Sequence, residues 1–583
     1  MKRNILKNVL FVIICCLVVI CITNVSVTAA DLTTTASLSQ NFPLTISTGE
    51  QQKIDAAAPV KATVKPLQKR KLLVVTLNVR DGKVTKGHNS IPYANYAIKM
   101  MGDKTGAYET FFSNDTMIFK PENLAQFDAI CFNNTVGVLF DDPELRQSLL
   151  DYVYSGKGFI GIHAAGATFV QWPVYDQWPA FGEMLGGYEN GGHPWGPHEW
   201  ITLKVDEPGH PVNAAFKGKG FEISDEVFQF QEPYSRDKLR VLLTIDTDKT
   251  DMSEQRYILP ERRADKDLAI SWLRNYGRGR VFYSTLGHNP HINWDMKILQ
   301  HYLDGFQFAL GDLPSPTTPS NKLTAAVKAQ EKLGWHVGIF PLNKTNTSFF
   351  ETVDKTATPG LLYTGAADTQ PVSKNIPNKF DYHLSPAEIK QIKTKLDSAG
   401  QRLLSYYITN PPADATENRK LFEFGRKMGI EIFIIDPGPK LPLDEFEKLC
   451  REFDIKLAFR NGDKNENPDY RNAKQLKKLC KNKNDKFGVC LDLSRWMASG
   501  LKPVDAVKAF KNRLFVIQLH DLNELSGSGS TVSGQIGDFL RQVGKQCNNS
   551  ILFGMDAFKQ QQELQKNARL FNDFSIKQVR NLK

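Results

Sequence analysis

Apolar runs of strand length alternate with amphipathic stretches along most of the chain. The first run covers residues 72–77, and a later stretch places Leu145, Leu149 and Val153 on one helical face. A further apolar run, residues 158–163, follows that stretch directly. Because apolar runs alternate with stretches of helical periodicity, the pattern predicts parallel sheets built from strand–helix–strand units.

Capping signals mark the start of two predicted helices. Asp142 is a candidate N-cap, Pro143 would occupy the first helical position, and an acidic residue follows it. Ser385 and Glu388 have the spacing of a capping box. We therefore expect helices to begin near residues 143 and 386.

The second half of the chain carries eight candidate strands at regular intervals. They cover residues 336–342, 360–364, 402–408, 431–436, 455–460, 487–492, 514–520 and 551–556. Eight strands, each followed by a helical or loop segment within about 260 residues, are typical of a (β/α)8 TIM barrel. We predict this barrel over residues 323–583.

Shifts in composition set the remaining boundaries. Residues 30–69 are rich in Thr, Ser, Ala, Gln and Lys with little apolar period, which predicts a flexible lead-in. Residues 313–322 contain three prolines and read as a stiff linker. Residues 70–312 are then the first α/β domain.

The first 29 residues have the layout of a secretory signal peptide. Lys2, Arg3 and Lys7 precede an apolar run over residues 9–22, and small residues surround Ala29, the expected cleavage site. The prediction is a secreted or periplasmic protein with no stable membrane insertion after cleavage. An uncleaved membrane anchor is the alternative.

Composition narrows the classes of partner. The chain has 583 residues, 41% hydrophobic and 23% charged, which is typical of globular domains. Its lysine clusters within residues 477–486 are broken by Asn and Asp and lack interleaved aromatic residues, so nucleic acid is not an expected partner.

Cysteines are expected to be core residues rather than disulfide partners. Three of the eight lie in the predicted signal peptide. The other five are odd in number and mostly lie within apolar runs: Cys131, Cys450, Cys480, Cys490 and Cys547.

Histidines gather beside glycine and proline in the first half. His163 and His288 end predicted strands, and His193 and His198 share a Gly/Pro-rich loop. Ligands bind at the carboxyl ends of parallel strands, and imidazole suits proton transfer near neutral pH. We predict a catalytic site there.

An acidic pair and a tryptophan are expected to belong to the same site. Asp225 and Glu226 are candidates to orient an imidazole or to transfer a second proton. Trp195 is expected to bind substrate beside His193, because an indole face packs well on apolar C–H groups. Core packing is the alternative for the tryptophan.

Five motifs in this half carry a family resemblance. They are GIHAA at residues 161–165, G-x-H-x-x-x-x-H at 191–198, HPV at 210–212, D-E-x-F at 225–228 and GRGRVFYSTLGH at 277–288. Together they resemble the trehalose-utilisation ThuA-like family over about residues 70–312. The resemblance implies a flavodoxin-like, class I glutamine-amidotransferase-like parallel sheet and a role in sugar catabolism.

Amide hydrolysis is not expected of this fold variant. His163 stands at the strand-to-helix turn that would present a nucleophilic cysteine in an amidotransferase. No Cys, Ser or Thr with a neighbouring base replaces it, which argues against covalent acyl transfer.

Two segments of the second half carry a second family resemblance: residues 487–496, FGVCLDLSRW, and residues 514–521, LFVIQLHD. They resemble strands six and seven of the xylose-isomerase-like sugar isomerase/epimerase family, which is related to type IV apurinic endonucleases. The family binds a divalent cation, and the resemblance implies Asp492, His520 and Asp556 as ligands.

The fourth ligand position breaks the family pattern. Arg460 stands where strand five should supply a glutamate, and a guanidinium cannot bind a cation. We therefore expect a degenerate metal site and require no cofactor. Arg460 would either pair with Asp492 or Asp556, or join Asp492 and His520 in a metal-independent sugar site.

These features together predict an exported carbohydrate-processing protein that acts on a keto- or otherwise modified sugar. Isomerisation, elimination or hydrolysis would begin with α-proton removal, with His163 as base and Glu226 as acid, and His198, Asp225 and His288 would complete the site. The alternative is an exported carbohydrate-binding protein without turnover. A glutamine amidotransferase and an apurinic endonuclease rank lower.

Overall fold

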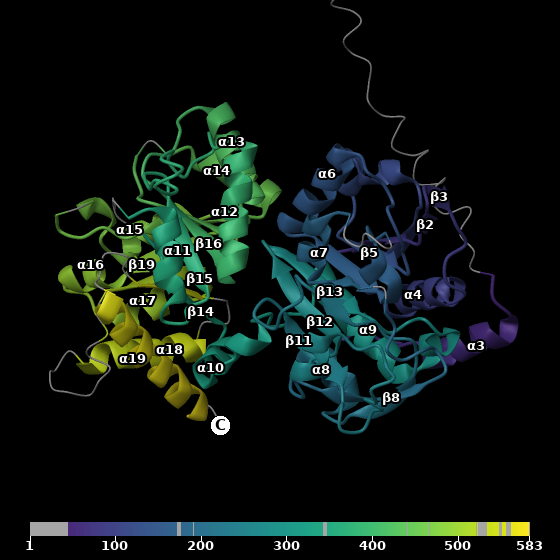
Figure 1. Cartoon of the computed structure of the whole chain (residues 1–583). Helices are drawn as coiled ribbons and strands as arrows, with labels where there is room; N and C mark the ends of the chain where they lie inside the picture. Colours follow the sequence, from purple (N-terminus) through teal and green to yellow (C-terminus); the bar gives the residue numbers. More distant parts are fainter. Residues whose placement is uncertain are drawn as a thin grey trace, which may run out of the picture.

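A computed structural model describes residues 45–171, 177–190, 192–341, 347–439, 441–465, 467–520, 522, 533–546, 551–555 and 561–581. Within them the chain forms two α/β units that lie beside each other (Figure 1). The predicted signal peptide, Cys547 and Asp556 lie outside the described residues.

The first unit is built on a nine-stranded sheet with the order β4-β1-β5-β6-β13-β12-β11-β8-β9. Its parallel strands are β4 (Glu109–Phe112), β1 (Lys71–Val75), β5 (Ala129–Asn133), β6 (Gly158–Ile162) and β13 (Gly279–Ser284). Its antiparallel strands are β12 (Ala269–Tyr276), β11 (Arg240–Ile245), β8 (Trp200–Val205) and β9 (Phe221–Ser224). The sheet is therefore only partly parallel, because the tight turn between β12 and β13 is too short for a parallel crossover.

Helices cover both faces of the parallel strands. Leu72 and Val74 pack with α4 (Ile91–Thr105) and α9 (Met296–Leu310) on one face. Leu73 and Val75 pack with α6 (Pro143–Tyr154) and α7 (Pro179–Leu185) on the other. Successive strand residues point to opposite faces, so each apolar run serves two cores. Shorter elements are α5 (Pro121–Leu124), α8 (Pro260–Asp265), β2 (Val79–Arg80), β3 (Lys83–Val84), β7 (Tyr188–Glu189) and β10 (Phe230–Gln231).

Both predicted helix starts are confirmed. The Asp142 side chain accepts a hydrogen bond from the backbone N–H of Glu144 at the start of α6. Ser385 and Glu388 form the capping box of α12 (Pro386–Ala399), which ends at Gly400.

Part of the expected flexible lead-in is ordered. Helix α3 (Thr48–Ala57) begins with a capping box of Ser47 and Glu50 and buries Ile54. The backbone N–H of Thr63 donates to the Gln307 side chain at 2.8 Å. Residues 45–69 show little apolar period because they form no core of their own and are held by contacts with α4 and α9.

The second unit is a closed barrel of eight parallel strands, as the repeated apolar runs predicted. The strands are β14 (Trp335–Ile339), β15 (Tyr363–Ala367), β16 (Arg402–Ile408), β17 (Ile432–Ile435), β18 (Lys456–Arg460), β19 (Phe487–Asp492), β20 (Leu514–Leu519) and β21 (Ile551–Met555). The helices are α10 (Ala325–Leu333), α11 (Phe349–Ala357), α12, α13 (Ala415–Lys427), α14 (Leu443–Phe453), α15 (Ala473–Cys480), α16 (Leu493–Ala498), α17 (Pro503–Phe510), α18 (Ser533–Gln546) and α19 (Gln561–Arg580).

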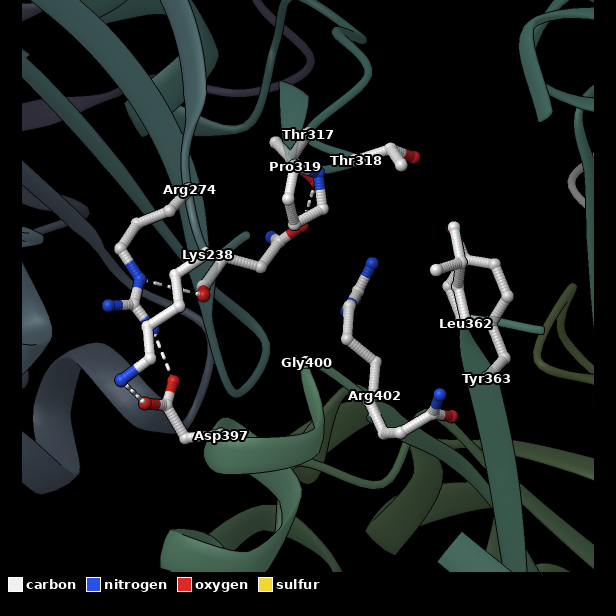
Figure 2. A pocket seen from close by; sticks show the side chains of 12 residues that line it. Lys238, Arg274, Thr317, Thr318, Pro319, Leu362, Tyr363, Asp397, Gly400 and Arg402 are labelled. Carbon is white, nitrogen blue, oxygen red and sulfur yellow. Dashed lines mark hydrogen bonds and ion pairs between the residues drawn. The ribbon is translucent and has the colours of Figure 1, made fainter. Parts of the chain in front are cut away.

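The two units dock where their parallel strands begin. Arg278, in the turn before β13, donates to the Asp454 carboxylate at 2.8 Å, and Asp454 lies just before β18. Arg274 and Lys238 both reach Asp397 at the end of α12 (Figure 2). The carboxyl ends of both strand sets therefore lie away from this interface.

The linker is packed rather than free. The backbone N–H of Ser320 donates to the Leu239 carbonyl at 2.8 Å, and Arg240 donates to the Thr318 carbonyl at 3.1 Å. His210 Nε2 lies 3.0 Å from the Pro316 carbonyl. These contacts tie the linker to the first unit.

The four described cysteines are buried and form no disulfide with one another. Burial raises the pKa of each thiol, to about 12 for Cys450 and about 11 for Cys480, as expected for core residues. No described helix has the length and apolar character needed to cross a bilayer.

Candidate functional site

Two neighbouring parallel strands end at the predicted histidines. Ile162 and Ser284 are partners in the register of β6 and β13, and His163 and His288 follow them. Nε2 of His163 lies 3.3 Å from Nδ1 of His288. The strand ends therefore bring residues 125 positions apart into contact.

His163 has a strained backbone and a fixed ring. Its φ of +47° is a left-handed conformation that residues other than glycine rarely adopt. Its Nδ1 lies 2.7 Å from the carbonyl oxygen of Thr285, which can only accept, so Nδ1 carries the proton. Its ring stacks on Phe228 at a centroid distance of 4.6 Å. The unprotonated Nε2 is thereby directed at His288 and Glu226.

Glu226 lies at the centre of the histidines. Its Oε1 is 3.2 Å from Nδ1 of His288, 3.7 Å from Nε2 of His193 and 3.9 Å from Nε2 of His163. The side chain is 13% exposed, whereas that of His163 is fully buried. Glu226 can therefore reach both solvent and the ring nitrogens.

His88 completes the cluster, and the sequence analysis did not single it out. Its ring centroid lies 5.1 Å from that of His163 and 5.2 Å from that of His288. In the sequence the residue lies between β3 and α4 and does not follow a parallel strand directly. The signal available in the sequence was the glycine at position 87. The structure explains it, because φ of Gly87 is +71° and a Cβ there would clash with Asn78.

Burial and charge divide the cluster into neutral and ionised groups. Burial lowers the pKa of His163 well below its ordinary value and that of His88 to about 4. Burial also opposes charge on His288, but the hydrogen bond and charge of Glu226 raise its pKa. The same contact, together with His193, outweighs burial and lowers the pKa of Glu226. His88 and His163 are therefore neutral, and His288 with Glu226 is the pair that favours charge.

Asp225 supports the site without facing it. Its carboxylate accepts hydrogen bonds from the backbone N–H groups of Gly287, His288 and Asn289, at 2.7, 3.3 and 2.8 Å. Burial raises its pKa to about 7, and these three donors act in the opposite direction. We interpret Asp225 as a positioning residue for His288.

The loop predicted to cover the site contributes only one of its histidines. His193 is 39% exposed, and its Nε2 lies 3.8 Å from Oε1 of the buried Glu189, a neighbour that the sequence analysis missed. His198 is exposed, and no hydrogen bond or ion pair among the described residues joins it to the cluster. Trp195 is 1% exposed and donates to the Asp251 carbonyl, so it is a core residue and not a sugar-binding surface.

An open cavity of about 440 Å³ adjoins the cluster at His88. It is lined by Asn78, Arg80, Thr85, Lys86, Gly87 and His88. Two cationic side chains therefore stand at the approach to the cluster.

The barrel mouth holds a second polar group. Nε2 of His520 lies 3.1 Å from Oδ1 of Asp492. Burial opposes the charge of Asp492, but the hydrogen bond and charge of His520 lower its pKa. Asp492 also accepts from the Arg495 backbone N–H at the start of α16.

Arg460 pairs with a residue that the sequence analysis did not name. Its Nε and Nη2 donate to the two carboxylate oxygens of Asp436 at 2.8 and 2.9 Å, and Nη2 donates to the Tyr407 hydroxyl at 3.0 Å. Asp436 follows β17, the neighbour of β18, so strand adjacency explains the pairing.

Comparison with known families addresses the first unit. Residues 75–309 match the ThuA family model, described as trehalose utilisation. This unit is a ThuA domain. No curated protein matches the chain.

Solved structures resemble each part of the chain in turn. A ThuA-like protein from Bacteroides uniformis is 19% identical, covers 42% of this chain and 94% of its own, and has a TM-score of 0.34. A sugar phosphate isomerase/epimerase from Parabacteroides distasonis is 14% identical, covers 41% and 95%, and has a TM-score of 0.31. A D-tagatose 3-epimerase-like protein is 13% identical, covers 42% and 100%, and has a TM-score of 0.33.

Proposed function

We propose that this chain is an exported carbohydrate-processing enzyme whose ThuA domain acts on a keto- or otherwise modified sugar. The observation that supports this most is the convergence of three histidine nitrogens within 3.9 Å of one Glu226 oxygen, at the carboxyl ends of parallel strands. The family description, trehalose utilisation, supports a carbohydrate as the substrate class.

The reaction begins with removal of a proton from the carbon next to a sugar carbonyl. The base takes the proton and an enediolate forms. Return of a proton to the neighbouring carbon gives the isomer, whereas loss of a substituent from the β-carbon gives elimination. Both outcomes need one group that accepts a proton and one that donates it.

The exposure of the side chains favours groups other than His163 as the proton acceptor and the proton donor. The buried ring of His163 cannot touch a substrate, so we assign it to positioning in place of the predicted role of base. Glu226 and His193 reach solvent and lie 3.7 Å apart, which suits an exchange of one proton between them. His288 holds Glu226 in its ionised form.

The test is exchange of substrate hydrogen with solvent. The full chain is incubated in D2O with D-fructose, D-tagatose or methyl 3-keto-glucoside, and deuterium in the sugar is measured by mass spectrometry. Exchange should occur with at least one of these sugars. Glu226→Gln should slow it by about 10²–10⁴-fold, the usual effect of losing a general base or acid.

Two controls separate the domains. Glu222→Gln makes the same change at an exposed position of β9 and should leave the rate unchanged. Asp492→Asn in the barrel mouth should also leave it nearly unchanged. Loss of exchange in the barrel variant with retention in Glu226→Gln would place the chemistry in the barrel instead.

Export is part of the same proposal. The basic start, apolar run and small residues near Ala29 support it. Mass spectrometry of the mature protein should find a chain beginning near residue 30, and a chain beginning at Met1 would contradict cleavage.

A further inference from the structure

We propose that His88, His163, His288 and Glu226 form a binding site for one divalent transition-metal ion of the class that prefers imidazole, such as Zn²⁺ or Co²⁺. Among the residues that the structure describes, this is the set of His, Cys, Asp and Glu side chains whose ligand atoms all lie within 4.8 Å of one another. The inference shares its location with the proposed active site but rests on ligand geometry, independently of the reaction.

The distances between ligand atoms fit such an ion. Bonds of about 2.0–2.1 Å in tetrahedral geometry place neighbouring ligand atoms about 3.3–3.4 Å apart. Oε1 of Glu226 is 3.2 Å from Nδ1 of His288, which is 3.3 Å from Nε2 of His163. The third separation among these three ligands, from Oε1 of Glu226 to Nε2 of His163, is 3.9 Å. These three need only small adjustments around a bound ion, and the ligand atom of His88, which lies within 4.8 Å of each of them, would have to move closer to complete the tetrahedron.

The three imidazole rings surround one point. Their centroids lie 5.1, 5.2 and 5.2 Å apart, with interplanar angles of 88°, 84° and 76°. Nearly equal spacing with nearly perpendicular planes lets three rings present edges to a common centre. Packing of the rings on one another alone would not require a carboxylate at the same centre.

The local surroundings leave two imidazole nitrogens available to a cation. The Thr285 carbonyl fixes the proton of His163 on Nδ1, as a backbone carbonyl does for metal-bound histidines, and leaves Nε2 free to coordinate. Nδ1 of His88 is buried without a hydrogen-bond partner in the described structure. An unsatisfied buried nitrogen is costly, and a cation bound there would remove that cost.

The charge and surroundings also suit a cation. Binding of the ion would displace the proton that Glu226 favours on His288, as metal binding does for its ligands. Three neutral imidazoles and one carboxylate then carry a net charge of −1, so a bound divalent ion would keep one positive charge. That charge could polarise a sugar carbonyl. His193 stays outside the ligand set, so with an ion bound to Glu226 it is His193 that would move the proton.

The experiment uses the untagged full-length chain, stripped with chelator and titrated with Co²⁺. Tetrahedral Co²⁺ absorbs strongly in the visible range, so its spectrum reports geometry as well as binding. We expect saturation at one ion per chain and displacement by Zn²⁺. Absence of visible bands at one equivalent of Co²⁺ would overturn the site.

Variants identify the ligands. His88→Gln and His288→Gln should each lower Co²⁺ affinity by about 100-fold or more, at least the loss typical of removing a second-shell partner. His291→Gln, an exposed position in the same domain, is the matched control and should bind like wild type. Circular dichroism of the apo variants checks folding. Retained affinity in both ligand variants, or its loss only in His520→Gln, would refute the assignment.

The outcome separates this inference from the proposed function. Co²⁺ binding without deuterium exchange into any test sugar would refute the function and leave the metal site standing. Full exchange by chelator-treated protein that binds no Co²⁺ would do the reverse.

Discussion

Replacement of Asp225 by asparagine tests how the His288 segment is held. The carboxylate accepts three backbone N–H groups, two on Oδ2 and one on Oδ1. An asparagine side chain offers one oxygen and one NH2 group, so at least one N–H donor of Gly287, His288 or Asn289 would face another donor. A buried unsatisfied donor costs about 1–3 kcal/mol, and loss of the carboxylate charge weakens the remaining bonds.

We expect Asp225→Asn to destabilise the ThuA domain by about 3 kcal/mol. For a domain of this size this corresponds to a fall of about 6–12 °C in melting temperature. Differential scanning calorimetry of the full chain measures it, and Asp248→Asn, whose side chain is 84% exposed, is the matched control. Co²⁺ affinity should also fall, because His288 loses its support.

The result would also fix the protonation state of Asp225. Burial favours the neutral acid, whereas three N–H donors favour the carboxylate. Asparagine resembles the neutral acid in shape and charge. A melting temperature of Asp225→Asn within about 2 °C of wild type would therefore refute the interpretation that Asp225 is ionised in the folded protein.

Three further predictions concern groups outside the site. Burial lowers the pKa of His210 to about 4 from an ordinary 6.5, so the neutral ring contributes stability above pH 6.5 that is lost as pH falls toward 4, about 3 kcal/mol in total. His210→Asn should reduce the loss of urea-unfolding stability across this range by about that amount, while other buried histidines keep their share; an unchanged pH dependence would count against it. Asp436→Asn should cost about 3 kcal/mol and more than Arg460→Met, because it removes the carboxylate charge from beside a guanidinium that is 3% exposed, whereas Asp436 is 38% exposed and can hydrate. Equal losses in chemical denaturation would contradict this. Arg278→Ala removes hydrogen bonds to Phe453 and Asp454 across the interface between the units. The two units should then unfold in separate calorimetric transitions. A single unchanged transition would argue that apolar contacts dominate the interface.

The barrel could be predicted from sequence because its information is local. Each strand is an apolar run of its own, and two predicted strands, residues 402–408 and 487–492, coincide with β16 and β19. The antiparallel half of the ThuA sheet was not predicted, because apolar runs alone do not state strand direction. Turn lengths around Gly277 carry that information.

Site residues could be predicted from the sequence only where they directly follow a buried strand. His163 and His288 follow buried strands and could be placed together in advance. His88 and Glu189 lie on short loop-borne segments whose positions depend on tertiary contacts. Trp195 was misread because an aromatic residue in a Gly/Pro loop looks the same in sequence whether it is buried or exposed. For Arg460 we predicted an ion pair with Asp492 or Asp556, whereas its carboxylate partner in the structure is Asp436, because Asp436 follows β17, the strand beside β18.

Docking of the two units through the starting ends of their strands has a kinetic consequence. The residues that line the clefts between the units include none of the histidine cluster and none of Arg460, Asp492 and His520. A sugar released by the ThuA domain would have to travel through bulk solvent around the molecule before it entered the barrel mouth. Fusion in one chain therefore raises the local concentration of one unit near the other but offers no sheltered passage, and a second enzyme in solution should be able to capture any shared intermediate.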